Sequence, residues 1–175
     1  MELCYVEKIE GCGYDRQILG LLEQADGEFI PPLSSRGSTT QQNLSTNQAV
    51  SDGVLDYFET MARQPAILAI EDGRCLGFMA FKIDYDCPQS PGFPNLYAST
   101  CVVSPQARGK GLMQGFYEKM MAVFPNHSIF TRTWHTNFAH LRVLEKLGFT
   151  LTHRLPAHRG PDLDTVYYAK LAPKQ

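Results

Sequence analysis

The sequence predicts a mixed α/β domain in which helices flank a sheet. Short apolar runs bounded by turn residues alternate along the chain with longer segments whose apolar residues recur at helical spacing. The chain has 175 residues, a length typical of one domain with enough interior to fold without disulfides or a structural metal. We therefore expect residues 1–175 to form a single domain.

The first third of the chain predicts one strand and two helices. Residues 3–9 form the expected strand, and residues 14–25 form an amphipathic helix because apolar side chains recur on one helical face. A polar segment rich in Ser, Thr, Gln and Asn follows over residues 31–53. Connections of this length inside a domain are often functional. A second helix is expected over residues 54–62.

The middle of the chain changes to a strand pattern. Residues 66–70 and 75–85 are predicted to pair as a hairpin, since residues 71–74 contain the turn signal Asp-Gly. A loop with three prolines covers residues 86–95. Residues 96–103 then form the third strand of this group.

The last third alternates helices and strands. A helix begins at Leu112 and ends before Pro125, and a second one runs from Asn137 to about residue 147, where Gly148 stops it. The strands are expected over residues 128–134, 149–153 and 165–171, with a basic loop between the last two. The resulting order is strand, two helices, three strands, helix, strand, helix, two strands.

Composition and charge exclude several classes of function. Sixteen Lys and Arg against eighteen Asp and Glu leave a net charge of −2, which argues against nucleic-acid and anionic-membrane partners. The first residues lack a secretory signal, and no apolar run approaches the roughly 20 residues of a membrane span. Five cysteines without a CxxC motif predict reduced thiols, and the histidine spacings predict no metal site. We therefore expect a cytoplasmic protein.

The most informative segment is the turn over residues 103–112, V-S-P-Q-A-R-G-K-G-L. It ends a strand and opens a helix, so several backbone N–H groups point to one spot at the positive end of the helix dipole. Gly109 and Gly111 permit close approach of a ligand, and Arg108 and Lys110 add positive charge. These features predict a phosphate site. The Walker A and dinucleotide patterns both fail here, which disfavours a nucleotide binder.

Two segments resemble the GNAT superfamily of N-acetyltransferases. Residues 106–111, Q-A-R-G-K-G, are similar to the loop with which that family holds the coenzyme A pyrophosphate. Residues 145–149, E-K-L-G-F, are similar to the end of a later helix in the family. The resemblance covers residues 66–171 well and residues 1–62 by element order. It implies a mainly antiparallel sheet flanked by helices, the acyl-CoA N-acyltransferase fold.

The resemblance also implies acetyl-coenzyme A as co-substrate and a set of residues that bind it. Loop amides would hold the pyrophosphate, and the preceding strand would pair with the pantetheine arm. The implied coenzyme-binding residues are Cys101, Val102, Val103, Gln106, Arg108, Gly109, Lys110, Gly111, Leu112, Met113 and Asn137. For Asn137 the simpler alternative is a helix cap.

The implied reaction is direct transfer of an acetyl group to a primary amine, of a small molecule or a peptide, in a ternary complex. Many family members use a helix tyrosine as general acid, and Leu144 stands at that position here. Tyr97, Ser99 and His140 are the catalytic candidates that remain, with packing as the alternative for each. We expect a monomer or a homodimer.

Two other functions stay open at this point. The missing tyrosine would suit a non-catalytic module that binds or senses acyl-coenzyme A, and the sequence does not fix the length of the acyl chain. The basic residues within 153–159 would suit an acceptor that carries a carboxylate or phosphate. The neutral polar loop over residues 31–53 favours a small polar acceptor.

Overall fold

The computed structural model describes residues 1–45 and 53–174. In this part of the chain the strands are β1 (Glu2–Val6), β2 (Ala66–Glu71), β3 (Arg74–Ile83), β4 (Asn95–Val103), β5 (Ser128–Trp134), β6 (Thr150–Gly160) and β7 (Leu163–Lys170). The α-helices are α1 (Asp15–Ala25), α2 (Leu55–Met61), α3 (Leu112–Val123) and α4 (Phe138–Lys146). Short 3₁₀ turns are η1 (Asp26–Glu28), η2 (Leu33–Ser35) and η3 (Pro105–Ala107). The order of helices and strands is the predicted one.

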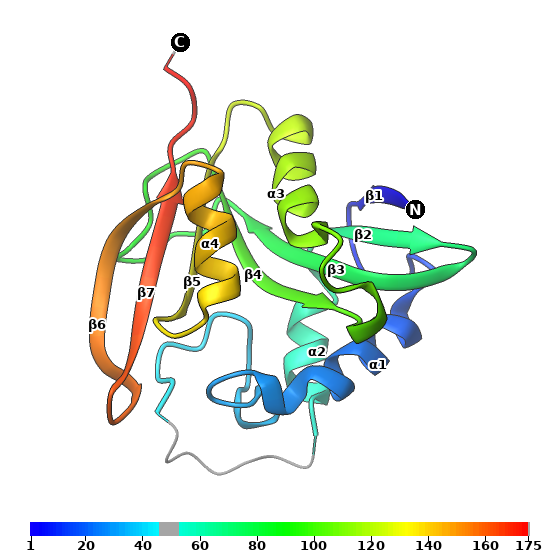
Figure 1. The fold of residues 1–175 in the computed structure, drawn as a ribbon, viewed down its shortest axis with the longest axis horizontal. Coiled ribbons are helices and arrows are strands. Elements are labelled where there is room, and N and C mark those ends of the chain that lie inside the picture. Colours follow the sequence, from blue (N-terminus) through cyan, green and yellow to red (C-terminus); the bar gives the residue numbers. More distant parts are fainter. Residues whose placement is uncertain (46–52, 175) are drawn as a thin grey trace.

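The strands form one sheet in the order β1-β2-β3-β4-β5-β7-β6 (Figure 1). Strands β1 to β4 pair antiparallel with their sequence neighbours, and β7 pairs antiparallel with both β5 and β6. The pair β4 and β5 is parallel, because α3 carries the chain back to the starting edge between them. The predicted mixed α/β class with a mainly antiparallel sheet is confirmed.

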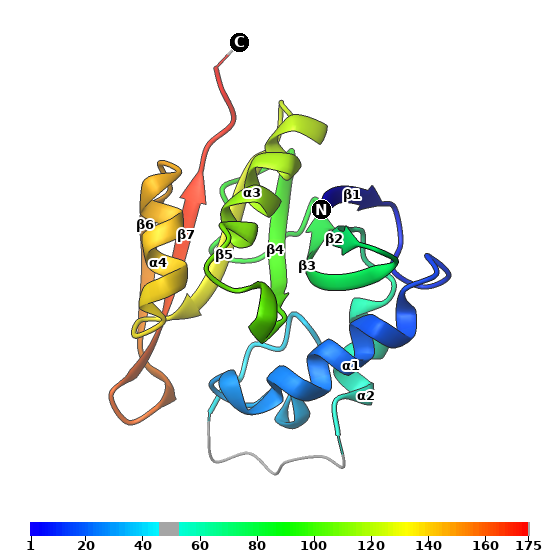
Figure 2. The same ribbon diagram turned by 45° about the vertical axis from the view of Figure 1, so that its right-hand side comes forward.

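Helices cover both faces of the sheet (Figures 1 and 2). On one face, Leu22 of α1 and Tyr57 of α2 belong to a buried cluster with Phe78 of β3. On the other, Phe116 of α3 and Leu144 of α4 are buried in a second cluster. The central strands are nearly continuously apolar because both of their faces are covered.

The parallel pair β4 and β5 separates halfway along its length. Pairing begins at Asn95 and Ser128 and ends at Ala98 and Thr131, although both strands continue beyond these residues. Ser99 is a bulge in β4, where the register with β3 shifts. A bulge bends its strand, and β4 and β5 diverge from this point (Figure 1). The divergence leaves space between two strands in the middle of the sheet.

The interpretation of residues 154–164 as a loop is wrong. β6 continues to Gly160, and only Pro161 and Asp162 turn the chain into β7. The pairing of β6 with β7 is irregular between Leu155 and Gly160, where Ala157 has a φ of 54°. β6 lies at the edge of the sheet and most of its side chains are exposed. Such a strand does not need the apolar alternation by which the other strands were predicted.

The polar segment over residues 31–53 is only partly described. Residues 31–45 pack onto the domain, since Leu33 and Leu44 are fully buried, and residues 46–52 lie outside the described residues. Within the described ranges, no helix has the length and apolar character needed to cross a bilayer.

Gly77 of β3 offers a direct test of the packing between β3 and β4. A Cβ atom there would lie 2.9 Å from the carbonyl oxygen of Val102. Gly77→Ala is therefore expected to lower the free energy of unfolding by about 1–3 kcal/mol, as overpacked cores do. The matched control is Gly20→Ala in α1, where an added Cβ meets nothing within 4 Å. Urea denaturation of both variants measures the effect, and equal stabilities would contradict the predicted clash.

Candidate active site

A cavity of about 520 Å³ opens where β4 and β5 diverge. It reaches both faces of the sheet, because its lining includes Tyr117 and His140 from the α3–α4 side and Arg36 and Thr39 from the α1–α2 side. We call the part at residues 108–114 the loop end. The part at Arg36, Arg132 and Arg159 is the arginine end.

The loop end presents free backbone donors. Gly109 and Gly111 have φ values of 77° and 74°, which glycine adopts readily. The first backbone hydrogen bond at the start of α3 runs from Gly115 N–H to the Gly111 carbonyl over 3.0 Å. Among the described residues, the N–H groups of residues 109–114 have no hydrogen-bond partner. Free N–H groups at a helix N-terminus favour a bound anion.

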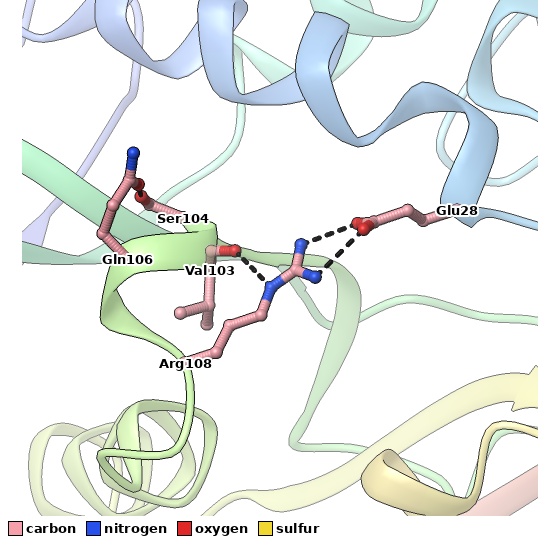
Figure 3. Close-up of polar contacts among 5 residues, drawn as sticks. All are labelled: Glu28, Val103, Ser104, Gln106 and Arg108. Carbon is pink, nitrogen blue, oxygen red and sulfur yellow. Dashed lines mark hydrogen bonds and ion pairs between the residues drawn. The ribbon is translucent and has the colours of Figure 1, made fainter.

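Two side chains of this loop form contacts within the protein that the sequence did not predict. Arg108 was expected to add positive charge to the site, but its guanidinium forms a bidentate pair with Glu28 of η1 at 2.8 and 3.0 Å (Figure 3). It also donates to the Val103 carbonyl at 3.1 Å. Gln106 accepts a hydrogen bond from Ser104 (Figure 3). The donors that this loop offers to a ligand are therefore backbone N–H groups rather than these two side chains.

Most of the predicted coenzyme residues line the cavity. These are Cys101, Val102, Val103, Arg108, Gly109, Gly111, Leu112, Met113 and Asn137. Gln106 and Lys110 are exposed and do not line it. Burial raises the pKa of the Cys101 thiol to about 12, so the thiol stays protonated at neutral pH and is a poor nucleophile.

Asn137 precedes α4 but does not cap it. Its side chain makes no capping hydrogen bond with the helix, and its amide instead donates to the Thr133 hydroxyl at 3.0 Å. The alternative of a plain helix cap is therefore wrong. The contact fixes the amide at the cavity wall, between β5 and α4.

His140 lies in the cavity wall and is hydrogen-bonded to a residue of α3. The hydroxyl of Tyr117 is 2.8 Å from Nε2 of His140. Burial lowers the pKa of His140 to about 4, so the ring is neutral at neutral pH. A neutral imidazole bonded at one nitrogen can donate or accept a proton at the other. Leu144, one turn further along, is fully buried in the core.

The other two catalytic candidates also line the cavity. Tyr97 is buried with its ring 4.9 Å from those of Tyr85 and Phe130, and burial raises the pKa of its phenol. The Ser99 hydroxyl accepts a hydrogen bond from Gln64 at 2.7 Å. Both side chains therefore have structural contacts, and their catalytic roles stay predictions.

Sequence reasoning missed two of the three residues of the arginine end, Arg36 and Arg132. Arg159 belongs to the basic residues 153–159 that were expected to suit an anionic acceptor, and it lines the cavity. Arg36 stands in the polar segment over residues 31–53, yet it is only 8% exposed and lines the cavity. Arg132 is half-buried and lies on the same face of β5 as the buried Phe130. An arginine within a mostly buried strand could have been recognised from the sequence as a candidate ligand-binding residue. Arg36 lies in an irregular segment and gave no such signal.

Comparison with known proteins agrees with this geometry. Residues 38–149 match the acetyltransferase (GNAT) family, which is more than half of the chain. The chain therefore belongs to the acetyltransferase (GNAT) family and is an acyltransferase by class. The comparison with curated proteins gave no significant match.

Solved structures share the fold. The structure of yncA from Salmonella typhimurium, which contains acetyl-CoA, has a TM-score of 0.65 and 16% identity, with 99% of this chain and 95% of that chain covered. The aminoglycoside 6'-N-acetyltransferase from Enterococcus faecium has a TM-score of 0.67 and 16% identity, with coverages of 100% and 99%. The ribosomal-protein-alanine N-acetyltransferase from Brucella melitensis has a TM-score of 0.66 and 14% identity, with coverages of 98% and 99%.

Proposed function

We propose that this protein transfers the acetyl group of acetyl-coenzyme A to a primary amine by direct attack in a ternary complex. One observation carries the proposal. The same cavity contains the loop end, with its free N–H groups, on one face of the sheet and the arginine end on the other face. Donor and acceptor can therefore enter from opposite faces and meet in the gap between β4 and β5.

The loop end suits the diphosphate of the coenzyme. The N–H groups of residues 109–114 would donate hydrogen bonds to it at the positive end of α3. The pantetheine arm would lie along Cys101, Val102 and Val103, where β4 has no pairing with β5. Asn137 would contact the coenzyme from the opposite wall. The coenzyme-binding part of the domain would span residues 66–171.

The reaction needs one net proton transfer. The amine nitrogen forms a bond to the thioester carbon, the carbon–sulfur bond breaks, and the proton lost by the amine ends on the departing sulfur. His140 is the candidate whose position fits a proton carrier, because its imidazole lines the cavity and its hydrogen bond with Tyr117 involves Nε2 alone. Tyr117 would act as a positioning residue that holds the ring by its 2.8 Å hydrogen bond.

The expected setting follows from the sequence. A net charge of −2 favours a small-molecule or peptide amine over nucleic acid or an anionic membrane. The five unpaired cysteines suit the cytoplasm. We propose a monomer or homodimer in which each chain carries its own complete cavity.

Calorimetric titration with acetyl-coenzyme A and free coenzyme A, followed by a thiol-release assay over a panel of amines, tests the proposal. Binding with amine-dependent thiol release is the expected result. Binding without turnover on any amine would support a non-catalytic sensing module instead. Absence of binding to both ligands would overturn the assignment of the loop end. Faster turnover of longer acyl donors would mean that the protein transfers a longer acyl group instead of acetyl.

A further inference from the structure

Three buried or half-buried cations meet at the arginine end without an acidic partner. Arg36 and Arg159 are 8% and 2% exposed. Arg132 has a guanidinium nitrogen, Nη1, that is buried and makes no hydrogen bond. Among the described residues, none of the three forms an ion pair with a carboxylate. Glu28 also lines the cavity, but it is paired with Arg108 at the loop end.

Neighbouring backbone carbonyls bring two of the guanidiniums together. Arg36 donates from Nε and Nη2 to the Pro31 carbonyl at 3.1 and 2.8 Å. Arg159 donates from Nη1 to the adjacent Ile30 carbonyl and from Nε to the Thr165 hydroxyl at 2.9 Å. Each contact uses only part of the five N–H donors of a guanidinium. These hydrogen bonds hold both guanidiniums at the cavity wall, where their remaining donors lie.

Aromatic rings and a third carbonyl complete the arrangement. The guanidinium carbon of Arg36 lies 5.8 Å from the centre of the Phe29 ring, and that of Arg159 lies 5.7 Å from the Trp134 ring. Arg132 donates from Nη2 to the Gln41 carbonyl at 2.6 Å. The three side chains are therefore fixed in position before any ligand arrives.

Burying three like charges together costs free energy of folding. Burial, with the charges of Arg36 and Arg132, lowers the pKa of Arg159 to about 9, so it remains a cation at neutral pH. Buried charges are normally paired, and buried donors are normally hydrogen-bonded. A purely structural role would explain a single buried guanidinium that donates hydrogen bonds to a backbone carbonyl. It does not explain three like charges with spare donors facing one cavity.

We propose that the acceptor is an amine that also carries a carboxylate or phosphate group, and that Arg36, Arg132 and Arg159 bind this anionic group. This inference rests on the proposed acetyl transfer. Guanidinium groups bind both anions through paired N–H donors. With its anion held at the arginine end, a short acceptor would extend its amine toward the gap between β4 and β5, where the thioester would lie.

Matched pairs of acceptors test the charge requirement. The thiol-release assay compares free amino acids with their carboxamides, and aminoalkyl phosphates with the corresponding amino alcohols. The anionic member of at least one pair is expected to have a kcat/KM about 10- to 100-fold higher, the range of a charge-assisted contact. The preferred pair distinguishes carboxylate from phosphate. Preference for neutral amines or polyamines would overturn the inference.

Arg132→Gln tests the cluster itself, with the exposed Arg63→Gln as control. Arg132→Gln should lower kcat/KM for the anionic acceptor about 10- to 100-fold more than that for its neutral partner, whereas Arg63→Gln should lower neither. Arg132→Lys, which keeps the charge, should recover part of the loss. An equal loss for anionic and neutral acceptors would mean that Arg132 only supports the fold.

A binding measurement separates this inference from the proposed function. Inorganic phosphate or acetate, added without coenzyme, should raise the melting temperature of the wild-type protein more than that of Arg132→Gln, and sodium chloride at equal ionic strength serves as control. This result would support the anion site even if acetyl-coenzyme A did not bind. Equal shifts in both proteins, together with no acceptor selectivity, would overturn the inference while acetyl transfer to other amines could stand.

Discussion

Gly111→Val is expected to abolish detectable binding of coenzyme A, and Gly109→Val to do the same. Both residues have left-handed backbone angles, with φ values of 74° and 77°, which a β-branched residue adopts only at a cost of about 1–2 kcal/mol. An added Cβ at either position meets no protein atom within 4 Å. The new side chain would instead occupy the space through which the diphosphate must approach the loop amides. Calorimetric titration with coenzyme A measures the loss.

The hairpin between β2 and β3 supplies a matched control. Gly73 also has a φ of 74°, and an added Cβ there likewise meets nothing within 4 Å. Gly73→Val thus carries the same backbone strain at a position that does not line the cavity. It should lose a similar amount of stability and keep its affinity for coenzyme A. Tight binding by Gly111→Val would show that the loop end has been assigned incorrectly.

His140→Gln is expected to lower kcat about 100-fold, within the usual range for loss of a general acid or base, with little change in the affinity for acetyl-coenzyme A. Glutamine keeps a hydrogen-bonding group near Tyr117 but cannot carry a proton. Steady-state kinetics, with Tyr97→Phe and Ser99→Ala measured alongside, compares the three candidates. An unchanged kcat in His140→Gln would assign the ring to packing alone.

The same variant should change the pH dependence of stability. The pKa of His140 is lowered by burial to about 4 from the ordinary value of 6.5, so the unfolded chain takes up a proton at a higher pH than the folded one. The wild type therefore loses stability as the pH falls from about 6.5 to about 4, by up to about 3 kcal/mol from this residue. Urea denaturation across this range should show a smaller loss for His140→Gln. The exposed His153→Gln is the control, and identical profiles for all three proteins would refute the buried neutral ring.

The sequence predicted those features that depend on local patterns. The loop before α3 could be located because its glycines, the preceding strand and the following helix are contiguous in the sequence. Strand β5 was predicted with its observed bounds because its turn residues are clear. The strand predicted over residues 149–153 was shorter than β6, because β6 is a polar edge strand whose pairing depends on β7 rather than on its own composition.

The basic residues 153–159, with Arg159 among them, were expected to suit an anionic acceptor, but the arginine end as a whole could not be predicted because its parts are distant in the sequence. Arg36 and Arg159 meet through the carbonyls of Pro31 and Ile30, a contact that joins the segment after α1 to β6. The spacing of apolar residues along the sequence carries no information about such a contact. The pairing of Tyr117 with His140 has the same origin, since two helices bring the side chains together. In each case the chemistry comes from tertiary packing, whereas the coenzyme loop comes from a single stretch of chain.

This division of the cavity has an evolutionary consequence. The loop end and the other predicted coenzyme residues belong to β4, α4 and the start of α3, whereas the arginine end is built from the segment after α1, β5 and β6. On the proposed assignment, substitutions in the segment around Phe29 to Gln41, or along the edge strand β6, would change which amine is selected without altering the recognition of the donor. Acceptor specificity would then be a separable trait, open to divergence or redesign while the loop before α3 stays constant.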